Sequence, residues 1–295
     1  MRRFLSAISF CFAITLVAGC CGSCANIQPG TLNSGIDIPK PQYFNYKRKN
    51  LDSHRAKLIK YISKRVVRVV CKKGLINTDT NTIVKNNVSC GWGSGTIIRS
   101  YSDHTFILTA YHVVNAAKKV GPYSNTEWFY YYMIETRNIK NEVLRTYGGT
   151  LLVAKDEPRD VAVLQIPYNL NIQTPISHDV ILGQEAHVLG YPWITAVEGV
   201  HISYTHGYIG TMHMGNKNDT SSKQHDRIDI DIYFGNSGSA VFDNKGMIVG
   251  MINSMSGIRF FGVGFYPRPK QTFGCSARGI LEFLDEARMV ELTGF

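Results

Sequence analysis

The chain has 295 residues, of which 44% are apolar and 18% are charged. This length and composition exclude an intrinsically disordered protein and fit one large domain or two small ones. The formal net charge of +10 raises the question of a nucleic-acid or anionic-membrane partner. Residues 47–73 hold eleven basic groups and one acid, so this single segment accounts for the whole excess.

The first residues of the chain have the pattern of a secretory signal. Basic residues at positions 2 and 3 precede an apolar run over 4–18, shorter than the about 20 residues of a transmembrane helix. The run ends in Val17-Ala18-Gly19-Cys20, which resembles a bacterial lipobox. We therefore expect a signal peptide over 1–19 and lipidation of Cys20, which predicts an extracytoplasmic, membrane-anchored lipoprotein of a bacterial (periplasmic) cell envelope. Plain cleavage after Ala25, followed by secretion, is the alternative.

Residues 20–50 are predicted to be a tether, because they contain Gly, Pro, Ser and Asn without periodicity. Leu51, Leu58, Ile59 and Ile62 recur at helical spacing with bases between them, which predicts a short amphipathic helix over 51–64. We expect the bases of residues 47–73 to rest on anionic lipid head groups. A nucleic-acid partner for this segment is the competing interpretation, and it is not expected of a secreted protein.

Beyond the helix, short β-branched or aromatic runs follow one another between Gly, Asn and Asp residues. Short runs separated by such turn residues predict an all-β sandwich or barrel rather than βαβ units. Residues 277–290 have the apolar spacing of a helix. The twelve strands are expected at 65–71, 93–99, 104–110, 128–135, 149–154, 160–166, 186–190, 202–210, 227–233, 239–242, 247–253 and 261–266.

Three segments contain residue types suited to nucleophilic catalysis. His112 ends an apolar run in Thr109-Ala110-Tyr111-His112, Asp160 precedes Val161-Ala162-Val163-Leu164, and Ser237 lies in Gly235-Asn236-Ser237-Gly238. A serine hydroxyl needs a base to remove its proton, and a carboxylate holds that histidine in one tautomer. Backbone N–H groups in a glycine-rich turn can stabilise an oxyanion. Each signal alone is modest, but the three in this order predict one catalytic site.

These three motifs resemble the catalytic motifs of the trypsin-like serine peptidases, and the HtrA-type bacterial proteases are the more similar branch. The resemblance runs from about residue 65 to residue 266. It implies two six-stranded antiparallel β-barrels with the site between them. The two helices predicted from apolar spacing lie before and after these barrels. The predicted strands divide six and six around 167–185, which agrees. The expected organisation is the basic helix and first barrel over 51–166, the second barrel over 167–270 and the C-terminal helix over 271–295.

The resemblance also implies a role for each matching residue. Ser237 is expected to be the nucleophile, His112 the general base and then acid, and Asp160 the orienting carboxylate. The N–H groups of Gly235 and Ser237 are expected to form the oxyanion hole. The residues implied in the specificity pocket are Asn253, Ser254, Met255 and Gly262.

Three departures from the family pattern limit what the resemblance implies. Gly238-Ser239-Ala240 stands where members of the family have Gly-Gly-Pro after the nucleophile. Asn236 stands where zymogen-type enzymes carry the Asp that pairs with a new N-terminus, so that mode of activation is not expected. HtrA proteins normally append PDZ domains, and the 29 residues after the last predicted strand are too few for one.

Two interpretations of the specificity pocket stay open. Asp231 lies six residues before Ser237, where enzymes that cut after Lys or Arg place an acid, so a basic P1 residue is one hypothesis. Ile228-Asp229-Ile230-Asp231-Ile232 alternates strictly, which is also the pattern of a strand with one solvated face. HtrA-type enzymes have an acid at the position of Asp229 and prefer small aliphatic P1 residues.

Neither a cofactor nor a metal site is expected, because the four histidines between 201 and 225 have irregular spacing and no accompanying cysteine. Cys71 and Cys90 end neighbouring apolar segments and are the expected pair if a disulfide forms; the third body cysteine is Cys275. The sequence thus predicts a serine endopeptidase that acts on proteins or peptides through an acyl-enzyme. The rival is an inactive peptidase fold that serves as a membrane-anchored binding or scaffold protein.

Overall fold

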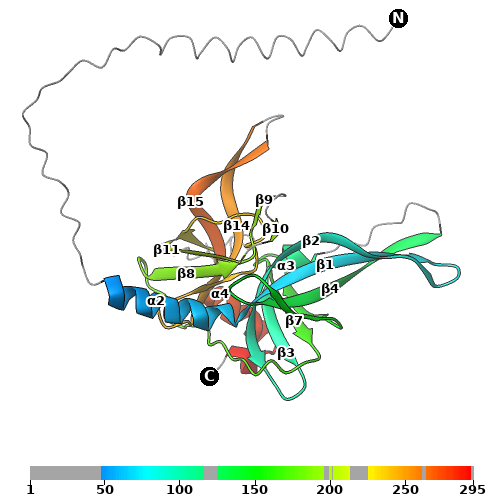
Figure 1. Ribbon diagram of the computed structural model, residues 1–295, viewed down its shortest axis with the longest axis horizontal. Coiled ribbons are helices and arrows are strands. Elements are labelled where there is room, and N and C mark those ends of the chain that lie inside the picture. The colour runs from blue at the N-terminus through cyan, green and yellow to red at the C-terminus, as the bar shows by residue number, and fades with distance from the viewer. Residues whose placement is uncertain are drawn as a thin grey trace, which may run out of the picture. The chain divides into compact units, whose positions relative to one another are not determined.

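The computed structural model describes residues 48–115, 125–195, 199–200, 202–212, 225–260 and 264–293. The expected signal peptide, Cys20, the tether up to residue 47, and Gly262 lie outside the described residues. Residues 47–295 form one compact unit. Its described part is mostly β and carries few helices, so the predicted all-β class is confirmed (Figure 1).

The first half of this unit is a seven-stranded antiparallel sheet with the order β5-β4-β1-β2-β3-β7-β6. One strand more than expected is present, because β5 was not recognisable from sequence. Its first four residues are all exposed, so the strand lacks the alternation that a buried face imposes. The strands are β1 (Val66–Asn77), β2 (Thr82–Ser100), β3 (Thr105–Thr109), β4 (Thr126–Arg137), β5 (Val143–Tyr147), β6 (Leu151–Asp156) and β7 (Val161–Ile166).

The second half is a closed six-stranded barrel with the order β11-β12-β15-β14-β13-β8. All of its pairings are antiparallel, as the trypsin-like resemblance implies. A separate short pair, β9 (Trp193–Thr195) and β10 (Gly199–Val200), follows β8. The barrel strands are β8 (Glu185–Gly190), β11 (Ser203–Thr211), β12 (His225–Asp229), β13 (Ala240–Phe242), β14 (Ile248–Phe260) and β15 (Gly264–Ser276).

Strands β1 and β2 continue well past their predicted ends as an extended hairpin. β1 was expected to end at residue 71 and β2 to begin at residue 93, whereas they run to Asn77 and from Thr82. β4 pairs with β1 over this extension, and the three strands form an arm (Figure 1). Residues 82–87 of β2 are exposed, so this part of the arm has no burial pattern that a sequence could reveal.

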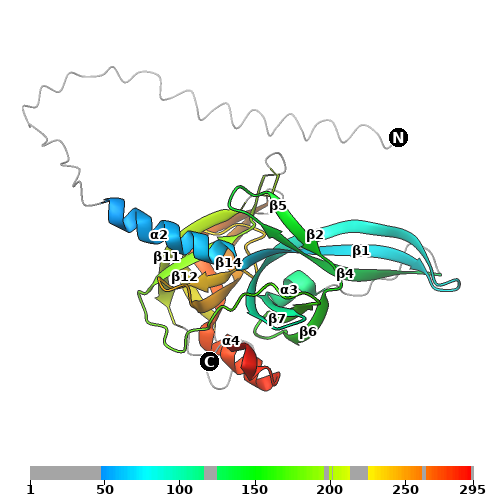
Figure 2. The ribbon, with the colours of Figure 1, turned by 60° about the horizontal axis from the view of Figure 1, so that its bottom comes forward.

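Both predicted helices are present, although the second ends at Glu286 and not at residue 290. Helix α2 (Arg48–Ser63) is the first element of the described chain (Figure 2). It buries Leu58 and Ile62 and leaves Lys57 and Lys60 exposed, which is the amphipathic arrangement expected from its spacing. Helix α4 (Ala277–Glu286) begins at Ser276, whose Oγ accepts a hydrogen bond of 3.0 Å from the N–H of Gly279. A one-turn 3₁₀ helix, η1 (Val290–Thr293), follows α4.

A shared hydrophobic core joins the two halves of the fold. It includes Leu108 and Val163 of the sheet, Met251 of the barrel, Ile62 of α2 and Leu284 of α4, all buried. Burial of such an aliphatic side chain contributes about 1.5–3 kcal/mol, so the halves pack against each other as firmly as the interior of a domain. Loops that end on this shared core are therefore held in fixed positions. Among the residues that the structure describes, no helix has the length and apolarity to span a membrane.

Candidate active site

His112 lies directly after strand β3, on the one-turn helix α3 (Tyr111–Val114). All five residues of β3 are buried, so the end of this strand is firmly placed. Ala110 keeps an extended backbone before the helical turn begins. The turn presents the His112 imidazole at the surface, where 48% of its side chain is exposed.

Asp160 lies in the tight turn between β6 and β7 and holds His112 from two sides. Its Oδ2 lies 2.7 Å from Nδ1 of His112, and its Oδ1 accepts the backbone N–H of the same histidine at 2.8 Å. The Asp160 backbone has a φ of +52°, a left-handed conformation that Asp and Asn tolerate better than most residues. A proton on Nδ1 faces the carboxylate in this arrangement, which leaves Nε2 of His112 to act as the base.

Ser237 lies in the turn between β12 and β13, and this turn is hydrogen-bonded to the opposite half of the fold. The N–H of Ser94 on β2 donates to the Ser237 carbonyl, and the Ser94 hydroxyl donates to the Gly235 carbonyl, both at 2.8 Å. Gly235 and Gly238 both have positive φ, at +95° and +85°. The glycines of the motif therefore permit a turn whose position is set by β2.

His112 and Ser237 line one cleft of about 720 Å³, and the N–H groups of Gly235 and Ser237 have no hydrogen-bond partner among the described residues. The Ser237 Oγ lies 3.5 Å from the Asn253 carbonyl. Within the described part of the chain, none of the hydrogen bonds joins Ser237 to His112. The structure thus brings together the three residues predicted to be catalytic, with the His–Asp contact formed.

We expect Gly238→Ala to destabilise the fold by more than about 2 kcal/mol. A Cβ at this position would lie 2.2 Å from the Ser94 carbonyl oxygen and 2.9 Å from the Ala110 backbone nitrogen. Gly148→Ala is the control, because nothing lies within 4 Å of the added Cβ. Urea denaturation of both variants measures the difference, and equal stability would contradict the tight packing of the Ser237 turn.

The predicted specificity residues occupy different environments. Asn253 is buried and its Nδ2 donates to the Arg159 carbonyl at 2.9 Å, so its side chain is turned away from the cleft. Ser254 is exposed, and the side chain of Met255 lies outside the described residues. Asp231 is exposed between the buried Ile230 and Ile232. In the described part of the chain it is not among the residues that line the cleft.

Arg159 is a site residue that the sequence did not reveal. Its side chain is 5% exposed and forms ion pairs with Asp156 and with Glu286 of α4. The hydrogen bond to Glu286 is the main cause of a raised pKa of the guanidinium. Arg159 immediately precedes Asp160, so this cluster attaches the turn that contains Asp160 to helix α4. Arg159 and Glu286 are 127 residues apart in sequence, so no local sequence pattern predicts their ion pair.

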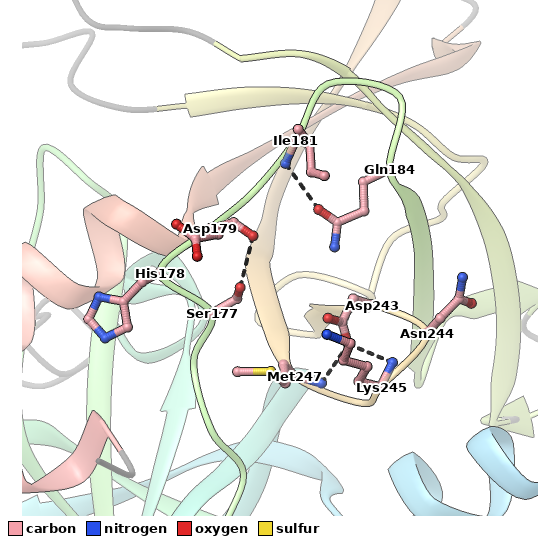
Figure 3. A pocket seen from close by; sticks show the side chains of 9 residues that line it. All are labelled: Ser177, His178, Asp179, Ile181, Gln184, Asp243, Asn244, Lys245 and Met247. Carbon is pink, nitrogen blue, oxygen red and sulfur yellow. Dashed lines mark hydrogen bonds between the residues drawn. The ribbon is translucent and has the colours of Figure 1, made fainter.

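A second hollow, between the 177–184 segment and the 243–247 turn, contains polar side chains but no catalytic pair (Figure 3). Some of its bonds are local: Ser177 Oγ donates to the Asp179 carbonyl, and the N–H of Ile181 donates to the Gln184 side chain. Asn244 instead reaches β8, where its Nδ2 donates to the Glu185 carboxylate at 2.8 Å. Nothing in it resembles the arrangement of His112, Asp160 and Ser237. Over the described residues, no three His, Cys, Asp or Glu side chains gather as a metal site would require.

A histidine held by a carboxylate, a serine on a glycine turn and a cleft shared by a β-sheet and a β-barrel define the class of serine peptidases. A family model described as "Trypsin-like peptidase domain" matches residues 93–251, more than half of the chain. The chain belongs to this trypsin-like family.

Two further comparisons agree with this assignment. A serine protease HtrA-like of Staphylococcus haemolyticus is 29% identical over 188 residues, which are 60% of this chain and 26% of that protein. The chain thus spans about a quarter of the length of this relative. The crystal structure of Deg5 has the same fold, with a TM-score of 0.52 and 18% identity over 79% of this chain and 92% of that one.

Proposed function

We propose that this chain is a serine endopeptidase that cleaves proteins or peptides through an acyl-enzyme. The observation that carries the proposal is the pair of hydrogen bonds between His112 and Asp160, with His112 on the same cleft as Ser237. His112 removes the Ser237 proton as the hydroxyl oxygen attacks the peptide carbonyl, and then protonates the leaving amine. Water, deprotonated by the same histidine, hydrolyses the ester. The unpartnered N–H groups of Gly235 and Ser237 are the donors proposed for the oxyanion.

Active-site labelling tests this proposal. A fluorophosphonate probe is expected to label Ser237 of the folded protein, because it reacts with an activated serine and not with an ordinary one. Ser237→Ala should lose the label, whereas Ser102→Ala, at an exposed serine on the β2–β3 turn, should keep it. Absence of label on Ser237 in folded protein would favour the inactive binding or scaffold protein instead.

For the P1 preference, we expect Val and Ala substrates to exceed Arg substrates by at least about tenfold in kcat/KM. Asp231, the candidate acid for a basic P1, is exposed on the alternating segment and does not line the described cleft. A panel of peptides that differ only at P1 measures this order, with Asp231→Asn as the matched variant. Faster cleavage of the Arg peptide by wild type, lost in Asp231→Asn, would establish a basic P1 instead.

We propose an extracytoplasmic location with membrane attachment through Cys20 and the basic segment 47–73. The lipobox-like motif and the concentration of basic charge support this proposal. One acylated residue binds a membrane weakly, and a polybasic segment adds the second attraction that firm anchoring needs. In the described part of this segment, Lys57, Lys60 and Lys64 are exposed and available to anionic head groups.

Neutralising the basic residues at the start of the segment is expected to weaken binding to vesicles of anionic lipid and to leave peptide cleavage unchanged. Each lysine or arginine near such a surface contributes about 1 kcal/mol, which salt screens. Vesicle sedimentation measures binding. The substitutions are at Lys47, Arg48, Lys49, Arg55 and Lys57.

An equal number of exposed bases elsewhere serve as the control for this experiment. Their neutralisation should leave vesicle binding close to that of wild type. Loss of cleavage with unchanged binding in the first variant would instead assign the segment to the enzyme. The control positions are Lys85, Lys140, Lys245, Arg278 and Arg288.

A further inference from the structure

Cys71 and Cys90 lie opposite each other where the β1–β2 hairpin leaves the cleft. In the ladder, Cys71 pairs with Gly91 and Lys72 pairs with Ser89, so Cys90 is the extra residue of a β-bulge. A bulge places two residues of one strand opposite one residue of its partner. Both cysteines are free thiols in the structure, so the disulfide expected from sequence is not formed there.

The two thiols differ in exposure. Cys90 is exposed, whereas Cys71 is 8% exposed and its side chain contacts the Cys90 thiol. Burial first, and the Cys90 neighbour second, raise the pKa of Cys71 to about 12. Cys71 is therefore almost entirely a protonated thiol at neutral pH and is a poor initial nucleophile.

Both thiols line the same cleft as His112 and Ser237. Lys73 lines this cleft as well, with its ammonium 4.1 Å from the Trp128 ring centre. Cys275, by contrast, is fully buried in the shared core, where burial raises its thiol pKa. Among the described cysteines, only the pair at the bulge combines access with a thiol partner.

We propose that Cys90 and Cys71 form a dithiol site on the wall of the catalytic cleft that low-molecular-weight disulfides oxidise to a Cys71–Cys90 disulfide. The Cys90 thiolate attacks one sulfur of the external disulfide, forms a mixed disulfide and releases one thiol. Cys71, deprotonated as it reacts, then attacks the Cys90 sulfur and releases the second thiol. Two protein thiols are oxidised by two electrons, and the external disulfide is reduced to two thiols. Proximity of the partner thiol compensates for its high pKa in the second step.

Thiol mapping of the folded full-length chain tests the proposal with oxidised glutathione as the probe. After incubation, alkylation of free thiols and peptide mapping should show Cys71 and Cys90 joined in one cross-linked peptide pair and Cys275 still alkylated. Cys71→Ser should retain glutathione on Cys90, and Cys90→Ser should leave Cys71 reduced. Separate alkylation of both thiols in wild type, or an adduct that starts on Cys71, would overturn the proposal.

Peptide hydrolysis supplies a second readout, which rests on the proposed peptidase function. In Cys71→Ser, glutathione stays attached to Cys90 on the wall of the cleft. Oxidised glutathione should therefore lower the peptidase activity of this variant at least tenfold, and a reducing agent should restore it. Wild type, which expels the adduct, should keep its activity. Equal activity of modified and unmodified Cys71→Ser would contradict the placement of Cys90 on the substrate path. If wild type hydrolyses nothing, the peptidase proposal fails while the thiol mapping still decides the dithiol site.

Discussion

Asp160→Asn is expected to lower kcat by about 10⁴-fold while the protein stays folded. The carboxylate oxygens accept Nδ1–H and the backbone N–H of His112, both within 2.8 Å. An amide in the same place would present an N–H to the ring and favour the tautomer that carries its proton on Nε2. His112 would then have no free nitrogen to receive the Ser237 proton. Steady-state hydrolysis of a peptide substrate at saturation measures the loss.

The fold is expected to survive this substitution for a specific backbone reason. Residue 160 has a φ of +52°, and Asn tolerates the left-handed region at least as well as Asp. Thermal unfolding should therefore change little between wild type and Asp160→Asn. A kcat within tenfold of wild type would show that Asp160 does not orient the base.

Arg159→Leu is expected to lower the free energy of unfolding by about 2–3 kcal/mol and to reduce kcat/KM as well. Loss of one partner from a buried ion pair costs about 3–5 kcal/mol. The expected loss lies below this range because Glu286 is 61% exposed and its carboxylate regains water when Arg159 is removed. Asp156, at 14% exposed, regains much less. Activity is expected to fall because the Arg159 side chain attaches the turn that contains the next residue, Asp160, to helix α4 through Glu286. Urea denaturation gives the stability change.

Arg278→Ala is the matched control for Arg159→Leu, because it removes an ion pair from the same helix. Arg278 pairs with Glu282 at 3.0 Å, but its side chain is 76% exposed. Exposed pairs of this kind contribute at most about 0.5 kcal/mol. A loss from Arg278→Ala as large as that from Arg159→Leu would mean that burial of the arginine is not what stabilises the α4 attachment.

Features encoded in short segments were predictable. The buried strands β3 and β7 and the helix α2 follow the predicted ranges closely, and α4 begins at the predicted residue, because a buried face imposes regular spacing on apolar residues. The exposed strand β5 and the outer part of the β1–β2 hairpin were missed for the same reason. Their backbones pair by hydrogen bonds that do not depend on side-chain type, and exposed side chains carry no periodicity.

The candidate catalytic residues could be predicted from sequence, because each stands in a local motif with a chemical requirement of its own. A glycine turn around Ser237, a strand end before His112 and a turn before β7 are all local properties of the chain. What depends on folding is how segments far apart in sequence meet. Ser94 holds the Ser237 turn across 141 residues, Glu286 holds Arg159 across 127, and a bulge brings Cys90 to Cys71. Such contacts arise from the packing of sheet, barrel and helix in three dimensions, and so the structure was needed to reveal them.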